Sequence, residues 1–252
     1  MKKVGFFIYA WGVMLSFFII HFFVATIGMC FFKNRAQAHM NFTKYFLQIY
    51  FILMKVKIHI KNIEHLPSKG PFSLVANHQS MIDIMLCMVV IQKPFAFIAK
   101  EELRWVPFVG LNIMLEKHFF INRKGEKDLS KQFSAIRSDL ERGRSLLVFP
   151  EGTRSFDGTL NPFKTRFFKL ALETKTTLIP VCINGSGKIL PKKKIFPSHG
   201  DLSITLGLPI KIPTWEKENT DLSESEKIAG LRDLVYKTIE FSLGELDLER
   251  TD

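Results

Sequence analysis

Two short stretches decide how this chain is interpreted: NHQSMID at residues 77–83 and FPEGTRS at residues 149–155. Each lies at the end of an apolar run, FSLVA at 72–76 for the first and SLLVF at 145–149 for the second. Runs of this length and composition are typical of buried strands. Because ligands of α/β proteins bind at the carboxyl ends of the strands, we expect both stretches at the same edge of a sheet.

Other patterns along the chain agree with an α/β fold. Residues 56–60 alternate with period two and predict a strand, whereas 82–90 predict a helix. Apolar residues recur at helical spacing up to Leu140, before Gly143 ends that helix. A capping box at residues 223–226 begins an amphipathic C-terminal helix. The sequence therefore predicts a mainly parallel central sheet flanked by helices.

The spacing of His78 and Asp83 suggests a general base with an orienting carboxylate. An aspartate on the first turn of a helix can reach back to an imidazole in the preceding turn. Such a carboxylate holds the tautomer whose free ring nitrogen faces the substrate. Ser80 is too close to both residues for an ordinary catalytic triad, so we expect it to cap the helix. The alternative is that His78 only caps the helix and has no catalytic role.

The second stretch has the composition of an anion site. Backbone N–H groups around Gly152, the hydroxyl of Thr153 and the guanidinium of Arg154 can all bind a phosphate. Arg123, which follows another strand-like run, is a second phosphate candidate because a guanidinium binds phosphate through a bidentate fork. A carboxylate beside a phosphate repels it, so we expect Glu151 to bind a substrate hydroxyl or to orient Arg154.

These stretches belong to five segments that, in this order, resemble the PlsC-type 1-acylglycerol-3-phosphate acyltransferases. The five are NHQSMID (77–83), KEEL (100–103) with Pro107 and Gly110, HFFINR (118–123), FPEGTRS (149–155) and IPVCING (179–185). The resemblance covers roughly residues 60–210. Similar sequences usually carry glycine at the positions of Lys117 and Arg166, and these departures bear on the shape of the acceptor pocket.

The resemblance implies transfer of a fatty acyl chain to the sn-2 hydroxyl of 1-acyl-glycerol 3-phosphate, giving phosphatidic acid without an acyl-enzyme. Acyl-CoA or acyl-carrier protein would be the co-substrate, and neither a cofactor nor a metal is expected. Lys100 is expected to reach the developing oxyanion or a phosphate of the donor. Two alternatives remain: a related acceptor such as glycerol 3-phosphate or another lysolipid, and a non-catalytic, membrane-bound protein that binds anionic lipids.

The N-terminal part of the chain predicts a membrane anchor. Residues 4–32 contain no Asp, Glu, Lys or Arg, and a helix of that length is about 43 Å long, more than the roughly 30 Å that a bilayer core requires. A second apolar run, 45–54, is too short to span. A cleaved signal peptide is the competing interpretation, but the apolar stretch is too long for one and Lys33 and Arg35 precede the cleavage-like site.

The distribution of charge favours an anchor that lies on the membrane. Eight lysines and arginines but no acidic residue precede Glu64, so this part carries +8 of the net charge of +11. Basic residues flank the apolar stretch at both ends, which gives no clear orientation for a single span. We therefore favour a two-helix hairpin in one leaflet with basic flanks on anionic headgroups, and a single span is the alternative. The catalytic part would face the cytoplasm.

Three segments are expected: the membrane anchor at 1–55, the α/β acyltransferase domain at 56–215 and a packing helix at 216–252. The three cysteines, Cys30, Cys87 and Cys182, lack C-x-x-C spacing and lie in apolar settings, which indicates neither a disulfide framework nor a metal site. A nucleic-acid partner is not expected, because the basic residues are interleaved with Phe-rich apolar sequence. Oligomeric state is open.

Overall fold

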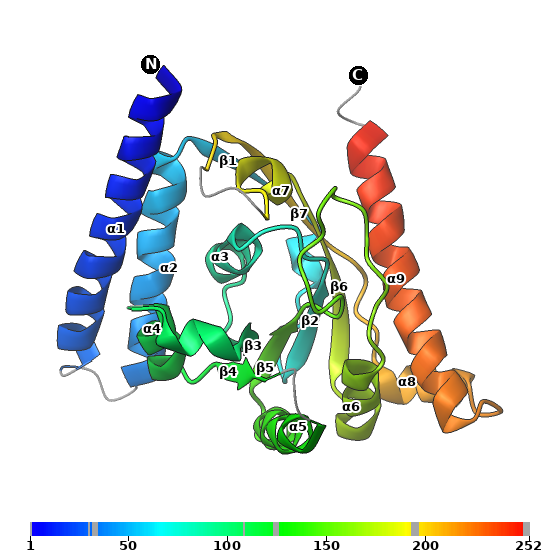
Figure 1. Cartoon of the computed structure of the whole chain (residues 1–252). Coiled ribbons are helices and arrows are strands. Elements are labelled where there is room, and N and C mark those ends of the chain that lie inside the picture. Colours follow the sequence, from blue (N-terminus) through cyan, green and yellow to red (C-terminus); the bar gives the residue numbers. More distant parts are fainter. Residues whose placement is uncertain are drawn as a thin grey trace.

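The computed structural model describes residues 2–29, 31, 35–107, 109–122, 126–192 and 197–248. Two long N-terminal helices run in opposite directions along one side of the molecule, and a twisted sheet with further helices forms the rest (Figure 1). The two helices are α1 (Lys2–Met29) and α2 (Arg35–Leu53). The N-terminal part is thus a helical hairpin packed against an α/β domain.

The sheet has seven strands in the order β1-β7-β6-β2-β5-β3-β4. Its strands are β1 (Val56–Lys61), β2 (Phe72–Ala76), β3 (Phe95–Lys100), β4 (Phe119–Ile121), β5 (Ser145–Val148), β6 (Thr177–Asn184) and β7 (Gly200–Leu206). Neighbours pair in parallel, except β6 with β7. The predicted mainly parallel sheet is confirmed, with one antiparallel pair inside it.

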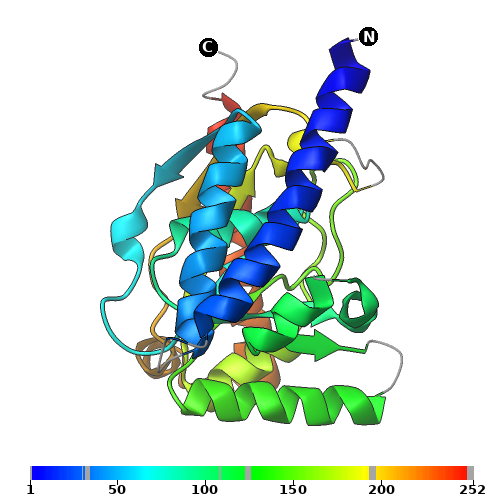
Figure 2. The ribbon, with the colours of Figure 1, turned by 90° about the vertical axis from the view of Figure 1, so that its left-hand side faces the viewer.

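Helices cover both faces of the sheet. They are α3 (Ile82–Val90), α4 (Val109–Leu115), α5 (Glu126–Glu141), α6 (Arg166–Thr174), α7 (Ser186–Ile189), α8 (Ile212–Glu218) and α9 (Glu224–Leu248), with 3-10 turns η1 (Ile63–His65) and η2 (Glu101–Trp105). The hairpin and α3 lie on one face, and α5, α6 and α9 on the other (Figures 1 and 2). Helix α8 runs through residue 215, where we expected the domain to end.

The central strand β2 shows how the sequence builds two cores. All five of its residues are buried, as expected of a strand covered on both sides. Phe72 and Leu74 point into the core shared with α2 and α3, whereas Val75 points into the core shared with α5, α6 and α9. Side chains of a strand alternate between faces, so this short apolar run supplies both cores at once.

The C-terminal helix begins as its sequence predicts. The Ser223 backbone N–H donates to Glu226 Oε2 at 2.8 Å, and the Glu226 N–H donates to Ser223 Oγ at 3.4 Å. These are the two reciprocal bonds of a capping box. Leu231, Val235 and Ile239 follow on one face and are fully buried. Helix α9 therefore closes the second core.

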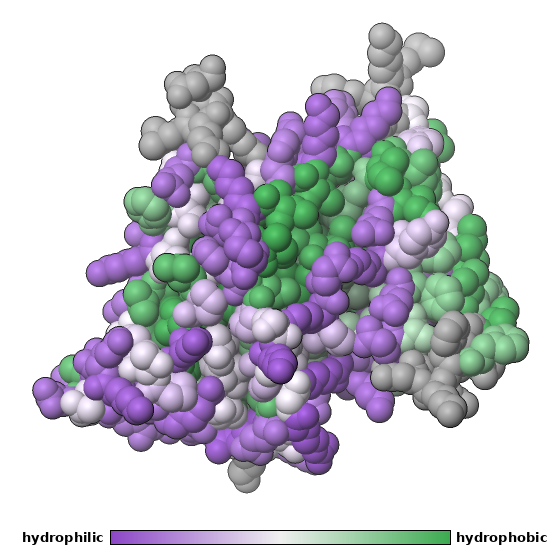
Figure 3. Space-filling model, turned by 180° about the vertical axis from the view of Figure 1, so that it is seen from behind, coloured by the Kyte–Doolittle hydropathy of each residue, from purple (hydrophilic) through white to green (hydrophobic). Residues whose placement is uncertain are grey.

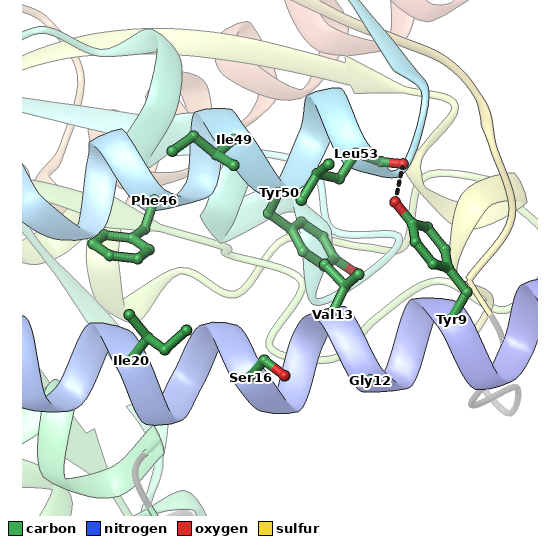
Figure 4. A pocket seen from close by; sticks show the side chains of 9 residues that line it. All are labelled: Tyr9, Gly12, Val13, Ser16, Ile20, Phe46, Ile49, Tyr50 and Leu53. Atoms are coloured by element: carbon green, nitrogen blue, oxygen red, sulfur yellow. Dashed lines mark hydrogen bonds between the residues drawn. The ribbon is translucent and has the colours of Figure 1, made fainter.

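The hairpin is joined to the domain through α2. Leu47, Phe51 and Met54 are buried in the first core. Between α1 and α2 lies an apolar groove of about 460 Å³, lined by Tyr9, Gly12, Val13, Ser16, Ile20, Phe46, Ile49, Tyr50 and Leu53 (Figure 4). The Tyr9 hydroxyl donates to the carbonyl of Leu53 at 3.4 Å and closes one end of this groove.

The outer side of the hairpin is apolar. Exposed large hydrophobic side chains there are Ile8, Tyr9, Leu15, Ile19, Ile20, Phe23, Val24, Ile27, Phe31, Tyr45, Ile49, Ile52 and Leu53. Seen from behind, apolar surface follows the edge of the molecule that the hairpin forms, at the right of Figure 3. Within the described ranges, no helix is both long enough and apolar enough to cross a membrane.

Two of the three cysteines lie in apolar settings, as the sequence suggested. Cys87 is buried in the first core and Cys182 in the second. Burial, with a smaller effect of the nearby Asp83, raises the pKa of the Cys87 thiol far above its usual value, so this thiol stays protonated. Cys30 lies outside the described residues.

Candidate active site

His78 and Asp83 form the hydrogen-bonded pair that their spacing suggested. The distance from His78 Nδ1 to Asp83 Oδ2 is 2.8 Å. The histidine follows β2 and the aspartate lies in the first turn of α3. The Asp83 side chain is fully buried, whereas 16% of the His78 side chain is exposed. Because His78 Nδ1 is bonded to Asp83, Nε2 is the ring nitrogen that can accept a proton from a substrate.

Asp83 also shapes the turn that carries His78. Its Oδ2 accepts the backbone N–H groups of Gln79 at 2.7 Å and Ser80 at 2.8 Å. One carboxylate oxygen therefore holds both the imidazole and the chain next to it. The Ser80 hydroxyl donates to the Leu190 carbonyl at 2.8 Å and accepts the Ile82 N–H at 3.3 Å, so it supports the start of the helix.

Parallel pairing of β2 with β5 brings the two sequence stretches together. Val75 pairs with Val148 in this ladder, and the same offset places His78 opposite Glu151. The His78 N–H indeed donates to Glu151 Oε1 at 2.6 Å, and the Ser155 N–H donates to the His78 carbonyl at 2.7 Å. The second stretch thus lies directly against the first.

Glu151 is buried and bonded through both of its oxygens. Oε1 accepts the His78 N–H, and Oε2 accepts the backbone N–H and the side-chain amide of Asn161 at 3.1 and 2.6 Å. Burial raises the pKa of this carboxyl, and the bonds from His78 and Asn161 oppose that effect. The hydrogen bonds that the structure describes for Glu151 are to these two residues. Glu151 therefore joins the turn that carries His78 to the loop that carries Asn161.

The loop after β5 makes a tight turn at Gly152. Its φ is +69°, in the left-handed region that favours glycine. A Cβ at this position would come within 2.9 Å of Lys164 Nζ, so the lysine approaches the turn closely. The preceding Phe149 stacks its ring on the His78 imidazole, with centroids 4.1 Å apart. The apolar ring covers one face of the imidazole, and glycine lets the chain turn beside it.

Thr153 and Arg154 remain accessible in this loop. Thr153 is exposed and Arg154 is half-buried. Lys192 donates through Nζ to Thr153 Oγ1 at 3.0 Å and to the Arg154 carbonyl at 2.8 Å. Among the described residues, no carboxylate pairs with the Arg154 guanidinium. Arg154 and Lys192 therefore form a positive surface next to His78, whereas Arg123, the other phosphate candidate, lies outside the described residues.

The other residues singled out from sequence lie on separate elements: Lys100 ends β3, Lys117 precedes β4 and Arg166 begins α6. Lys100 ends β3, is exposed and forms an ion pair with Glu102 at 2.9 Å. Lys117 has φ +57°, so the left-handed backbone is kept where similar sequences carry glycine. Arg166 begins α6, with its guanidinium 5.7 Å from the centre of the Phe133 ring. The two departures from the family pattern thus cause no break in the fold.

Sequence reasoning missed three contributors to this site. The Asn77 amide donates to the Ile183 carbonyl and accepts the Ile183 N–H, at 2.8 and 2.7 Å, which ties the first stretch to β6. Asn161 binds Glu151, and only the folded loop reveals this contact. Lys192 belongs to a lysine run that we expected to be either a solvated face or a headgroup contact.

Comparison with known proteins identifies the family. Residues 57–184, half of the chain, match the Acyltransferase family model, so the chain belongs to that family. A 1-acyl-sn-glycerol-3-phosphate acyltransferase of Cocos nucifera is 33% identical over 145 residues, which are 57% of this chain and 47% of that protein. The chain thus spans about half the length of this relative. A protein of the same name from Borreliella burgdorferi is 28% identical over 75% of this chain and 74% of its own length.

A solved structure shares the fold over nearly the whole chain. It is the crystal structure of the 1-acyl-sn-glycerophosphate acyltransferase PlsC from Thermotoga maritima, with a TM-score of 0.84 and 24% identity. The match covers 98% of this chain and 96% of that one, so it includes the N-terminal hairpin as well as the sheet.

The position of Glu151 generates a testable expectation. Replacing Glu151 with Ala leaves the buried His78 and Asn161 donors without their acceptor, so the free energy of unfolding should fall by about 1–3 kcal/mol. Asp157→Ala removes an exposed carboxylate from the same loop and should have a clearly smaller effect. Denaturant unfolding measures the free energy of unfolding of both variants. An equal fall in that free energy for the two variants would contradict the role of Glu151 in joining the two loops.

Proposed function

We propose that this protein transfers a fatty acyl chain from acyl-CoA or acyl-carrier protein to the sn-2 hydroxyl of 1-acyl-glycerol 3-phosphate, forming phosphatidic acid. The observation that carries the proposal is the His78–Asp83 pair, 2.8 Å apart at the carboxyl edge of the sheet, with the loop after β5 bonded against it. Membership in the Acyltransferase family and the names of the relatives support the reaction type.

In the proposed mechanism His78 acts as general base. Its Nε2 takes the proton of the acceptor hydroxyl while the hydroxyl oxygen attacks the thioester carbonyl. Asp83 stabilises the imidazolium that forms, and the C–S bond then breaks as the imidazolium returns its proton to the departing thiolate. The products are the ester and a free thiol. A positioned imidazole contributes roughly 10²- to 10⁴-fold to such a step.

The acceptor phosphate is assigned to the loop after β5. Arg154 supplies a bidentate guanidinium, and Thr153 with the backbone around Gly152 supplies further donors. Arg123 is the second guanidinium of this proposal. Lys192, held beside Thr153 and Arg154, adds positive charge at the same place.

Lys100 and Glu151 complete the proposed set of site residues. Lys100 is assigned to the oxyanion or to a donor phosphate, which requires it to exchange its ion pair with Glu102 for the substrate. Glu151 acts on the substrate through the loops that it joins, because both of its oxygens already accept hydrogen bonds.

A related acceptor is the second candidate function. Lys117 and Arg166 stand where similar sequences have glycine, and these departures leave room for a different acceptor. Glycerol 3-phosphate and other lysolipids are therefore the acceptors to compare. A non-catalytic protein that binds anionic lipids would bind the acceptor lipid without converting it to product.

The deciding experiment measures thiol release from acyl-CoA and acyl-carrier protein with a panel of lysolipid acceptors. His78→Ala should lower turnover at least 100-fold, because the proton acceptor is lost. Asp83→Asn should lose most of the rate. His59→Ala, which changes an exposed histidine on β1, should keep the wild-type rate.

Two outcomes would contradict the assignment. A folded His78→Ala variant that kept more than about a tenth of the rate would remove His78 as general base. No thiol release by the wild-type protein with any acceptor, together with retained lipid binding, would favour the non-catalytic alternative. Circular dichroism of each variant verifies that it is folded.

Arg154 gives a separate expectation about the acceptor. Arg154→Ala removes charge-assisted hydrogen bonds worth about 1.5–3 kcal/mol, so the acceptor KM should rise about tenfold to a hundredfold. Arg154→Lys should restore part of the affinity, because lysine keeps the charge and loses the fork. A raised donor KM with an unchanged acceptor KM would instead assign Arg154 to the phosphates of the donor.

We further propose that the hairpin holds the enzyme on a membrane surface, with the catalytic domain on the cytoplasmic side. Its outer side exposes many large apolar side chains, and the part of the chain before Glu64 carries eight basic residues and no acidic one. Apolar side chains can enter the headgroup region while lysines and arginines bind anionic lipids. The acceptor, itself a lipid, would then be reached from the same surface.

Vesicle binding tests the hairpin. Phe23 and Phe241 are 56% and 67% exposed and belong to α1 and α9, helices that lie on opposite faces of the sheet. Burying one such side chain is worth about 1.5–3 kcal/mol, so Phe23→Glu should weaken binding to anionic vesicles at least tenfold. Phe241→Glu should not. Equal weakening by both changes, or by neither, would contradict the hairpin as the membrane-binding face.

A further inference from the structure

A cluster of buried polar side chains lies where the hairpin meets the domain. It contains His21 of α1, His39 and Thr43 of α2, and Glu116 and His118, which lie between α4 and β4. Their exposed fractions are 1%, 0%, 9%, 2% and 7%. None of them takes part in the proposed acyl transfer. A charged and polar group of this size is costly to bury unless its members are bonded to each other or to a ligand.

Glu116 is the centre of this cluster. Its Oε1 accepts hydrogen bonds from His39 Nδ1 at 2.7 Å and from the Thr43 hydroxyl at 2.5 Å, and its Oε2 accepts one from His118 Nε2 at 2.8 Å. The Thr43 hydroxyl also lies 3.0 Å from His21 Nε2. Three side chains therefore bond one carboxylate, and His21 joins the cluster through Thr43.

The types of side chain in the cluster suit a cation. Imidazole nitrogens and carboxylate oxygens are common ligands of metal ions. Here two imidazoles and one carboxylate, all buried, come from separate parts of the fold and face one another.

We propose that His21, His39 and Glu116 bind one divalent transition-metal ion, of which Zn²⁺ is the best match. Each offers one ligand atom, and the three atoms lie within 4.8 Å of one another. Two histidines and one carboxylate are a ligand set that Zn²⁺ prefers, at about 2.0–2.2 Å from each atom.

Neighbouring groups support the arrangement. His118 bonds the second oxygen of Glu116 and so orients the carboxylate. His39 Nε2 is buried and has no hydrogen-bond partner in the part of the chain that the structure describes, which leaves ligand capacity on this ring. The Thr43 oxygen lies next to both His21 and Glu116, where it can serve as a fourth ligand.

The ion would have a structural role. It would crosslink α1, α2 and the segment between α4 and β4, and so fix the hairpin to the domain that carries His78. The cysteine spacing gave no indication of such a site, because the ligands are two histidines and one glutamate spread over 96 positions of the chain. Only the folded chain brings them together.

The test uses the full chain, in detergent and without a histidine tag. Co²⁺ serves as the spectroscopic probe, because a site with nitrogen and oxygen ligands in tetrahedral geometry gives strong visible absorption. We expect saturation at one Co²⁺ per chain and displacement by Zn²⁺. Bound Zn²⁺ should raise the midpoint of thermal unfolding, and a chelator should reverse the rise. No saturable absorption and no shift in the midpoint would overturn the proposal.

Variants identify the ligands. Glu116→Gln, which keeps the volume of the side chain, and His39→Ala should lose the absorption. His118→Gln should weaken binding about 10- to 100-fold, as expected for a group that orients a ligand. His59→Ala, an exposed histidine on β1, should bind as the wild type does. Unchanged Co²⁺ binding in both Glu116→Gln and His39→Ala would place any bound ion elsewhere and so overturn the assignment.

Discussion

The parallel pairing of β2 with β5 is the constraint on which the candidate site depends. These strands lie next to each other in the middle of the sheet, although their paired residues, such as Ser73 and Leu146, are 73 positions apart along the chain. Their register continues beyond the strands into the bond between the His78 N–H and Glu151. A shift of this ladder by one residue would turn the buried side chains of β2 to the wrong faces and would also separate the imidazole from the loop after β5. The same backbone hydrogen bonds therefore place both the buried side chains of β2 and the residues of the candidate site.

Local signals in the sequence were enough for the elements around the site. The run of five apolar residues before the first stretch matched β2, and the expected helix at 82–90 matched α3, because burial on both faces and helical spacing leave distinct patterns. The capping box at Ser223 located the start of α9 for a similar reason, since both of its partners lie within four residues. Each of these features is decided by neighbours in the chain.

Contacts between distant segments could not be predicted in the same way. Glu151 was expected to bind a substrate hydroxyl or to orient Arg154, and the local sequence gave no sign of the contacts that it makes with the His78 N–H, seventy-three residues earlier, and with Asn161. The antiparallel pair of β6 with β7 also follows from how the chain returns after α7 rather than from any local pattern. Lys117 is instructive because its side chain differs from the family pattern while its backbone keeps a left-handed conformation, at a cost of roughly 1–2 kcal/mol for a residue with a Cβ.

The buried carboxylate of Glu116 bears on how the hairpin and the domain move. Pulling α2 away from the α4–β4 segment would leave an ionised group in an apolar interior with fewer donors, which opposes any hinge at this contact. We therefore expect the hairpin and the sheet to move together as one rigid body. On any surface that the hairpin binds, the His78 imidazole is held at one height and one tilt, so the position of the attacking hydroxyl along a lipid would be selected by geometry before any chemistry begins.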